Sequence, residues 1–387
     1  MSLSLKSALQ TKVKVCLTIA MLVFSSAALS GVSSIPAPPV SVDSYILVDH
    51  QTGEVLAEKN SDNRVEPASL VKIMTTYIVA QAIRDGHLEL TETTKVSKKA
   101  WRMEGSRMFI EVGKDVSIDD LLNGVIVQSG NDSSVALAEH LFGSEAAFVE
   151  KMNLEAKKLK MHNTRFGNVT GLPDRETYLS ARDTVTLSRA LIREFPEIYS
   201  RFKLREFKYN SIKQRNRNAL LFRDSTVDGI KTGYTESAGY CLVSSAKRKS
   251  MRLVAAVMGA KSNYMRVKDS RTLLSYGFRF FDTRGIFEVG EEIATHRVWL
   301  GKKDFVKAGV RAPVFMTMQK GKFKDMKVNK EFMEPLKAPI EKGQIIGKVE
   351  VNLPSGINYS EDIVALEEIE RAGFFSSLPD QIDLLFD

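Results

Sequence analysis

The sequence predicts an α+β fold, in which a helical group packs against an antiparallel sheet, followed by a small all-β domain. Three observations predict it. Long apolar runs suited to buried helices lie in the first half of the chain. β-rich segments joined by a tight turn lie near residue 250, and short segments separated by glycine and lysine turns lie beyond residue 284. Because helices and strands come in groups rather than in alternation, a parallel βαβ sheet is not expected.

The expected elements before residue 260 are, in order, strands at 44–49 and 54–57, helices at 67–83, 117–127, 133–142 and 144–160, and strands at 227–232, 240–246 and 252–258. The run at 67–83 is apolar on most faces, which is typical of a helix buried in a core. Ser117 and Asp120 have capping-box spacing, and Gly143 ends the third helix. The basic turn at 247–250 joins the last two strands as a hairpin.

Segments at 298–300, 314–318 and 345–351 predict three strands of the small all-β domain. We therefore expect a mixed domain over residues 41–283, an all-β domain over 284–366 and a tail over 367–387. The stretch that begins at residue 363 is expected to be helical at its start.

The composition is that of a globular chain of 387 residues, with room for two or three domains. Hydrophobic residues make up 43% and charged residues 26%, which excludes wholesale disorder. Two cysteines, Cys16 and Cys241, exclude a disulfide scaffold, and Cys241 is expected to be a small buried hydrophobe. The five histidines form no metal-binding motif, so neither a metal nor another cofactor is expected.

Residues 1–30 are typical of a secretory signal peptide. Three lysines precede an uncharged stretch whose most apolar part, residues 15–24, is shorter than the roughly 20 residues that span a bilayer. Ala28 and Ser30 predict cleavage near residue 30, and an uncleaved anchor is the alternative. We therefore expect an exported, periplasmic protein. The acidic, apolar tip from Pro379 onward leaves peripheral attachment to the outer face of the cytoplasmic membrane open.

The formal net charge is +8, and the lysines and arginines are spread along the chain. Nucleic acid is not an expected partner, because binding it requires a clustered basic patch and export removes it from reach. An anionic wall polymer or a membrane surface suits a mildly basic exported protein better. The alternative is that the charge serves solubility alone.

The candidate catalytic residues begin with Ser69 and Lys72, which form an S-x-x-K motif at the start of the predicted buried helix. At this spacing both side chains lie on one helix face. A lysine can take the proton of a serine hydroxyl if burial or a nearby cation lowers its pKa toward neutrality. Alone the motif is weak, since such tetrapeptides arise by chance. Ser129-Gly130-Asn131 and Lys231-Thr232-Gly233, which follow in order, strengthen it.

These three motifs resemble those of penicillin-interacting serine enzymes. The longer segments 66–75, 128–132, 180–183, 227–233 and 276–281 resemble the low-molecular-weight D-alanyl-D-alanine carboxypeptidases, including penicillin-binding proteins 5 and 6. The resemblance covers nearly the whole mature chain. It implies a penicillin-binding, β-lactamase-like catalytic domain at 41–283. The substrate would be a peptidoglycan stem peptide ending in D-Ala-D-Ala, and β-lactams would inhibit covalently.

The resemblance also implies a role for each site residue. Ser69 would attack the penultimate D-alanine carbonyl, Lys72 would take its proton, and Lys231 would keep the pKa of Lys72 low. Ser129 would pass a proton to the departing D-alanine. The substrate-binding residues would be Asn131 at the peptide backbone, Lys231 and Thr232 at the terminal carboxylate, Gly233 at the edge strand, and the Tyr234 backbone N–H, with that of Ser69, in the oxyanion hole.

The sequence departs from the family pattern at two places, and three alternative functions stay open. Many relatives have histidine where this chain has Tyr234, and the tail lacks the usual basic amphipathic helix. Asp183 is read either as part of a deacylation region or as an arginine partner, and Arg217 either as a cleft residue or as an exposed loop arginine. A weak β-lactamase, a transpeptidase and an inactive peptidoglycan-binding homologue are the alternative functions. The E-x-x-L-N segment of one β-lactamase class is absent.

Overall fold

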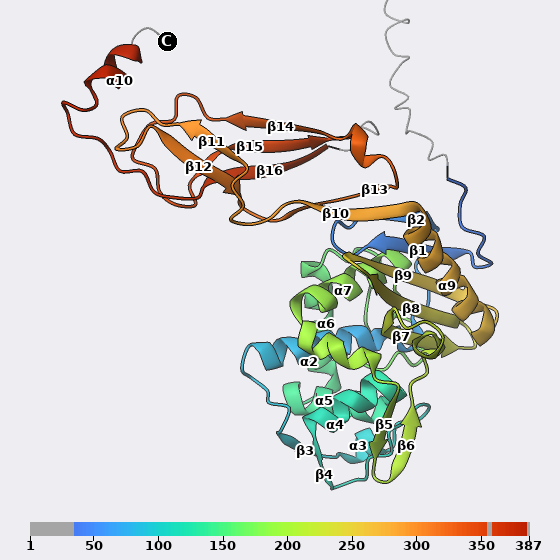
Figure 1. The fold of residues 1–387 in the computed structure, drawn as a ribbon. Coiled ribbons are helices and arrows are strands. Elements are labelled where there is room, and N and C mark those ends of the chain that lie inside the picture. The colour runs from blue at the N-terminus through green and yellow to red at the C-terminus, as the bar shows by residue number, and fades with distance from the viewer. Residues whose placement is uncertain (1–34, 354–357, 385–387) are drawn as a thin grey trace, which may run out of the picture.

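The computed structural model describes residues 35–353 and 358–384, so the predicted signal peptide lies outside the described residues. Two groups of elements stand one above the other in Figure 1, a larger mixed group and an elongated group of strands. The mixed group is built around a five-stranded antiparallel sheet of order β2-β1-β9-β8-β7. Its strands are β1 (Ser44–Asp49), β2 (Val55–Lys59), β7 (Val227–Thr235), β8 (Gly239–Arg248) and β9 (Met251–Ala260).

Helices cover both faces of this sheet (Figure 1). One face packs against α9 (Asn263–Phe280), and the other packs against a helical group. That group comprises α2 (Lys72–Arg84), α3 (Lys98–Trp101), α4 (Ile118–Asn123), α5 (Asn131–Phe142), α6 (Glu145–Lys158), α7 (Ala181–Glu194) and α8 (Pro196–Tyr199). Residues 72–80 of α2 are buried on every side, as the apolar run predicted.

Serine caps define several helix starts. Ser117 accepts a hydrogen bond from the Asp120 N–H and Ser144 one from the Ala147 N–H, which confirms both predicted starts. Serine N-caps of the same kind also begin two helices that were not predicted from the sequence, α7 after Ser180 and α9 after Ser262.

Short elements complete the mixed group. They are the 3₁₀ turns η1 (Ala68–Val71), η3 (Ser200–Lys203) and η4 (Ala219–Phe222), the π-helical turn η2 (Gly124–Gln128), and two hairpins, β3 (Thr93–Lys95) with β4 (Asp115–Ser117) and β5 (Glu206–Tyr209) with β6 (Ile212–Arg215).

The second group has its own apolar core beneath a sheet of order β11-β12-β16-β15-β14. Its elements are β10 (Phe281–Phe287), β11 (Ala294–Arg297), β12 (Phe305–Val310), β13 (Val314–Gln319), η5 (Phe323–Asp325), β14 (Lys327–Phe332), β15 (Ile345–Asn352), β16 (Asn358–Ala365) and α10 (Leu378–Asp383). Two expectations were wrong. Residues 298–300 form no strand, since Trp299 makes only an isolated bridge to Lys337. Residues 363–365 belong to β16 rather than to a helix, because they pair with both β12 and β15.

A buried hydroxyl network joins the two groups. The Asp49 carboxylate, at the end of β1, accepts hydrogen bonds from Thr52 and from the Thr283 hydroxyl in β10 at 2.7 Å. Thr317 of β13 contacts both threonines through its own hydroxyl. Asp49 is completely buried, so these donors satisfy a carboxylate that water does not reach.

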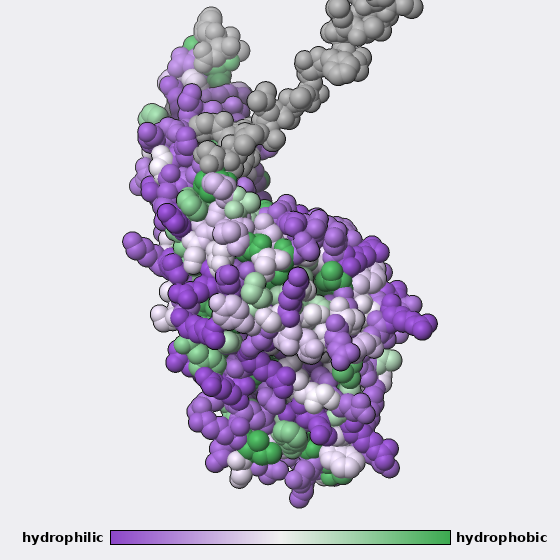
Figure 2. Space-filling view, turned by 90° about the vertical axis from the view of Figure 1, so that its right-hand side faces the viewer, coloured by the Kyte–Doolittle hydropathy of each residue, from purple (hydrophilic) through white to green (hydrophobic). Residues whose placement is uncertain are grey.

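One face of the molecule is largely polar. Figure 2 views the right-hand side of Figure 1, and on that face hydrophilic residues predominate while hydrophobic ones are scattered. Within the described residues, no helix is both long and apolar enough to span a membrane.

Candidate active site

Ser69 and Lys72 meet at the junction of two helical segments. Ser69 lies in η1, ahead of α2, and Lys72 is the first residue of α2, so the serine is not inside the α-helix that the sequence predicted. The Lys72 Nζ lies 3.2 Å from the Ser69 Oγ, within hydrogen-bond reach. Ala68, just before the serine, has a φ of +47°, a left-handed conformation that is strained for a residue with a Cβ.

Lys72 is buried, and its ammonium group has three hydrogen-bond partners. Its Nζ donates to the Asn131 Oδ1 at 2.7 Å and to the Thr170 carbonyl at 2.5 Å. The pKa of Lys72 is lowered to about 7, first by burial and then by charge repulsion from Arg217, while Asp132 opposes the shift. The family resemblance implied that Lys231 keeps the pKa of Lys72 low. In the structure the largest cause of the lowered pKa is burial, and the second is the charge of Arg217.

The second motif lies where a helix is interrupted. The turn η2 ends at Gln128, and the next residue, Ser129, has a φ of +63° that breaks the helix before α5 begins at Asn131. The Ser129 Oγ accepts a hydrogen bond of 2.8 Å from the Lys231 Nζ. The Nδ2 of Asn131 donates to the Glu104 carbonyl, so both ends of this amide have partners.

The third motif lies on β7, the edge strand next to η1. Lys231 is buried, and its pKa is lowered well below the usual range, first by burial and then by Lys72, Arg217 and Arg266. Lys231 also donates to the Thr232 carbonyl at 2.9 Å. A Cβ on Gly233 would lie 3.0 Å from the Pro67 carbonyl, so this glycine lets β7 approach the segment that carries Ser69.

The Tyr234 side chain is directed outward. It is 51% exposed and packs on Tyr240 with ring centroids 4.3 Å apart. Behind the strand, the Arg266 guanidinium donates to the Gly233 carbonyl at 2.9 Å and to the Cys241 carbonyl at 3.2 Å. Cys241 itself is buried, as expected. Arg266 thus holds β7 and β8 together at the level of the third motif.

The structure brings all three motifs together around two serines and two lysines. Asp183, by contrast, binds the Asn163 N–H and the Thr164 hydroxyl, each at 2.7 Å, instead of an arginine. Arg217 is an exposed side chain whose charge nevertheless reaches both lysines.

Sequence reasoning missed the supporting groups. The Asp132 carboxylate accepts N–H hydrogen bonds from Met108 and Phe109 at 3.0 and 2.9 Å and fixes a loop beside the site. Its position directly after Ser129-Gly130-Asn131 was a signal that could have marked it. The Thr170 carbonyl carried no signal, because any residue supplies one.

No group of histidine, cysteine and carboxylate side chains suited to a metal occurs in the part of the chain that the structure describes. The arrangement has the Ser69 hydroxyl beside a lysine of lowered pKa, and a second hydroxyl, that of Ser129, paired with a second lysine. Together with the fold, it fits the class of serine enzymes in which a lysine, rather than a histidine, serves as the base.

Comparison with known proteins gives the family. Residues 32–262 match the family described as D-alanyl-D-alanine carboxypeptidase, and residues 281–371 match the C-terminal domain of penicillin-binding protein 5. The chain therefore belongs to the D-alanyl-D-alanine carboxypeptidase family.

Individual relatives agree. The chain is 40% identical to the D-alanyl-D-alanine carboxypeptidase DacC of Escherichia coli over 95% of its own length and 94% of that protein. It is 41% identical to the D-alanyl-D-alanine carboxypeptidase DacA of the same organism, over 90% of its own length and 89% of that protein. Penicillin-binding protein 5 of Haemophilus influenzae superposes with a TM-score of 0.80 at 39% identity, covering 87% of this chain and all of that one. Penicillin-binding protein D2 of Listeria monocytogenes, solved in its ampicillin-bound form, superposes with a TM-score of 0.58 at 30% identity. The match covers 63% of this chain and all of that one.

Proposed function

We propose that this serine-type D-alanyl-D-alanine carboxypeptidase removes the terminal D-alanine of peptidoglycan stem peptides through an acyl-enzyme on Ser69. The observation that carries the proposal is the pairing of Ser69 with Lys72, whose pKa of about 7 lets it accept the serine proton at neutral pH. The free electron pair of neutral Lys72 takes that proton while the Ser69 Oγ bonds to the carbonyl carbon.

The remaining roles follow from placement. Ser129, paired with Lys231, would deliver a proton to the departing D-alanine nitrogen. Lys231 and Thr232 would bind the terminal carboxylate, and Asn131 would bind the peptide backbone. The N–H groups of Ser69 and Tyr234 would receive the oxyanion. Water then releases the shortened peptide and regenerates the Ser69 hydroxyl.

The partners and setting belong to the same proposal. β-Lactams would acylate Ser69, in keeping with the ampicillin-bound relative. Residues 1–30 would direct export to the periplasm. The catalytic domain would span 41–283 and a small β domain 284–366. The tail at 367–387 would be a weak amphipathic membrane anchor, since an anionic membrane surface repels carboxylates such as Asp383.

Release of D-alanine from a peptide ending in D-Ala-D-Ala tests the proposal, with the Ser69→Ala variant as control. We expect release from the wild type and none above background from the variant, because no other described hydroxyl contacts Lys72. Folded wild-type protein that releases no D-alanine, yet forms a Ser69 adduct with labelled penicillin, would favour a transpeptidase. Absence of both reactions would favour an inactive peptidoglycan-binding homologue.

A further inference from the structure

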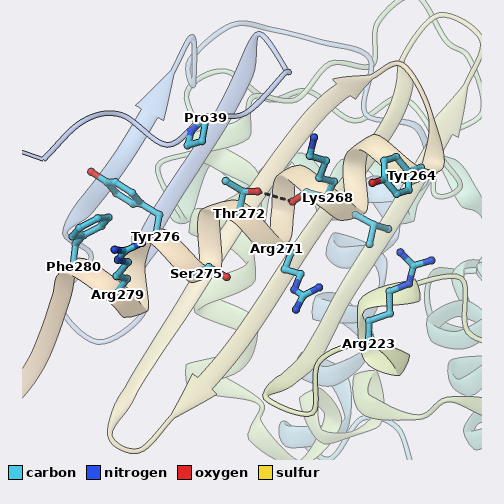
Figure 3. Close-up of a pocket in the computed structure, with 11 residues that line it drawn as sticks. Pro39, Arg223, Tyr264, Lys268, Arg271, Thr272, Ser275, Tyr276, Arg279 and Phe280 are labelled. Carbon is cyan, nitrogen blue, oxygen red and sulfur yellow. Dashed lines mark hydrogen bonds between the residues drawn. The ribbon is translucent and has the colours of Figure 1, made fainter.

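A pocket of about 430 Å³ lies on the outer face of α9, away from the three motifs. Its wall is formed by α9, by Pro39 in the segment before β1, and by Arg223 just after η4 (Figure 3). The α9 side of the sheet has a separate apolar core from the side that carries α2. A ligand in this pocket would therefore leave the Ser69 site accessible.

Four cations line the pocket, and no carboxylate does: Arg223, Lys268, Arg271 and Arg279. Lys268, Arg271 and Arg279 share one face of α9, since they lie three and eight residues apart. Arg271 and Arg223 extend into the same gap between α9 and the loop after η4 (Figure 3). Within the described residues, none of the four has a carboxylate within ion-pair distance.

The two carboxylates nearest in sequence to these cations are already engaged. Asp269 is buried and accepts a hydrogen bond of 2.7 Å from the Ser41 hydroxyl. Asp224 accepts one of 2.6 Å from the Thr226 hydroxyl and contacts Arg248 at 3.5 Å. Burial raises the pKa of Asp224, but the Thr226 hydrogen bonds and then the charges of Arg248 and Arg271 outweigh burial and lower it. Asp224 therefore offsets the positive charge of the pocket only at longer range, and no cation of the lining has a contact ion pair among the described residues.

The rest of the lining is suited to a small organic group. The buried side chains of Val267 and Tyr276 also line it, and Tyr264 and Phe280 add aromatic surface. The Ser275 hydroxyl is exposed and has no partner among the described residues. A guanidinium binds carboxylate and phosphate oxygens alike through two parallel N–H bonds. Four cations without a carboxylate in the lining favour the more highly charged of the two groups, a phosphate.

We propose that this pocket binds a small phosphate ester of the glycerol phosphate type. Arg223 and Arg271 would hold the phosphate, and the aromatic side chains would contact the carbon skeleton. Such a group is present in soluble glycerol phosphates and in the headgroup of phosphatidylglycerol, and the pocket would recognise the chemistry that they share. The site does not depend on the catalytic function.

Binding of glycerol 3-phosphate to the full chain, followed by titration calorimetry, tests the proposal. We expect saturable one-site binding that weakens with ionic strength. The double variant Arg223→Gln/Arg271→Gln should bind at least about tenfold more weakly, because it loses charge-assisted hydrogen bonds. A second arm measures sedimentation with phosphatidylglycerol vesicles against phosphatidylcholine vesicles, and distinguishes a lipid headgroup from a soluble ester.

The matched control is Lys327→Gln/Lys348→Gln, which removes two exposed cations from strands β14 and β15 and gives the same net charge. It should bind like the wild type in both arms. Unchanged circular-dichroism spectra and thermal unfolding show that each variant is folded. Binding that is absent in both arms, or reduced equally in both double variants, would overturn the proposal and reduce the pocket to a general surface charge.

Discussion

In the proposed mechanism, Lys72 acts as a base because the protein destabilises its ammonium form. Its three hydrogen-bond partners, the Ser69 hydroxyl, the Asn131 amide and the Thr170 carbonyl, carry no formal charge, so none of them stabilises the cation as a carboxylate would. Burial is then the largest cause of the shift that brings the pKa of Lys72 to about 7. The base is thus prepared mainly by exclusion of water, with the charge of Arg217 as the second cause.

Acylation of the wild type by labelled penicillin should accelerate as pH rises through about 7, because Lys72 loses its proton there. Arg217→Gln removes a repelling cation, so the pKa of Lys72 should rise and the accelerating limb should move to higher pH. We expect roughly two- to fivefold slower acylation at pH 7. Second-order rate constants measured across pH 5.5–9 check this.

Arg215→Gln is the control for this prediction. Arg215 is also exposed and near in sequence, but it packs over the Phe222 ring and does not affect the pKa of Lys72. Its pH profile should match that of the wild type. A profile for Arg217→Gln that keeps its midpoint would show that this charge does not act through Lys72.

At the scale of elements, the site depends on how closely η1 is held by its neighbours. Gly171, in the loop that supplies the Thr170 carbonyl, has a φ of +78°, and a Cβ there would lie 1.8 Å from the Ala68 carbonyl. On the other side, Gly233 brings β7 against Pro67. Two glycines therefore allow two backbone segments to close on the turn that carries Ser69.

Gly171→Ala should displace η1 and slow acylation about 100-fold, the effect expected when a reacting group moves by roughly 1 Å. Gly86→Ala is the matched control, because Gly86 also has a left-handed φ, of +73°, but no neighbour within 4 Å of an added Cβ. It should lose about 1 kcal/mol of stability and keep its acylation rate. Equal acylation rates in the two variants would contradict the steric argument.

Sequence patterns predicted the elements that carry their own signals. The apolar run of α2, the serine caps of α4 and α6, and the hairpin of β8 and β9 are local features, and each was found. The helix α9 was missed because no long apolar run marks it, and α7 was missed although Ser180 and Asp183 could have marked its start. The three motifs could be found in the sequence, but the Thr170 carbonyl and the loop bound by Asp132 required the tertiary structure.

For the whole molecule, the junction between the mixed group and the strand-rich group contains buried polar contacts as well as apolar ones. Asp49 belongs to the first group, while Thr283 and Thr317 belong to the two-stranded sheet of β10 and β13. A buried carboxylate that loses a donor is costly, because no water replaces the lost bond. The network therefore couples the stability of the junction to three hydroxyl groups.

Thr283→Val should lower the free energy of unfolding by about 1–3 kcal/mol, since Asp49 loses a buried hydrogen bond. Thr295→Val, on the exposed face of β11, should change it by less than about 0.5 kcal/mol. Urea unfolding monitored by circular dichroism measures both. Equal midpoints for the two variants would show that the network adds nothing to stability.

The wide spacing of the motifs has a consequence for how the chain matures. The Lys231–Ser129 contact joins residues 102 positions apart, and the Lys72–Asn131 contact joins residues 59 apart. Long loops close slowly during folding, so a partly folded chain carries every motif but lacks the site. A covalent penicillin adduct would therefore form only on chains in which these long-range contacts have been made. Pulse labelling during refolding would then time the last long-range step, rather than the earlier formation of helices.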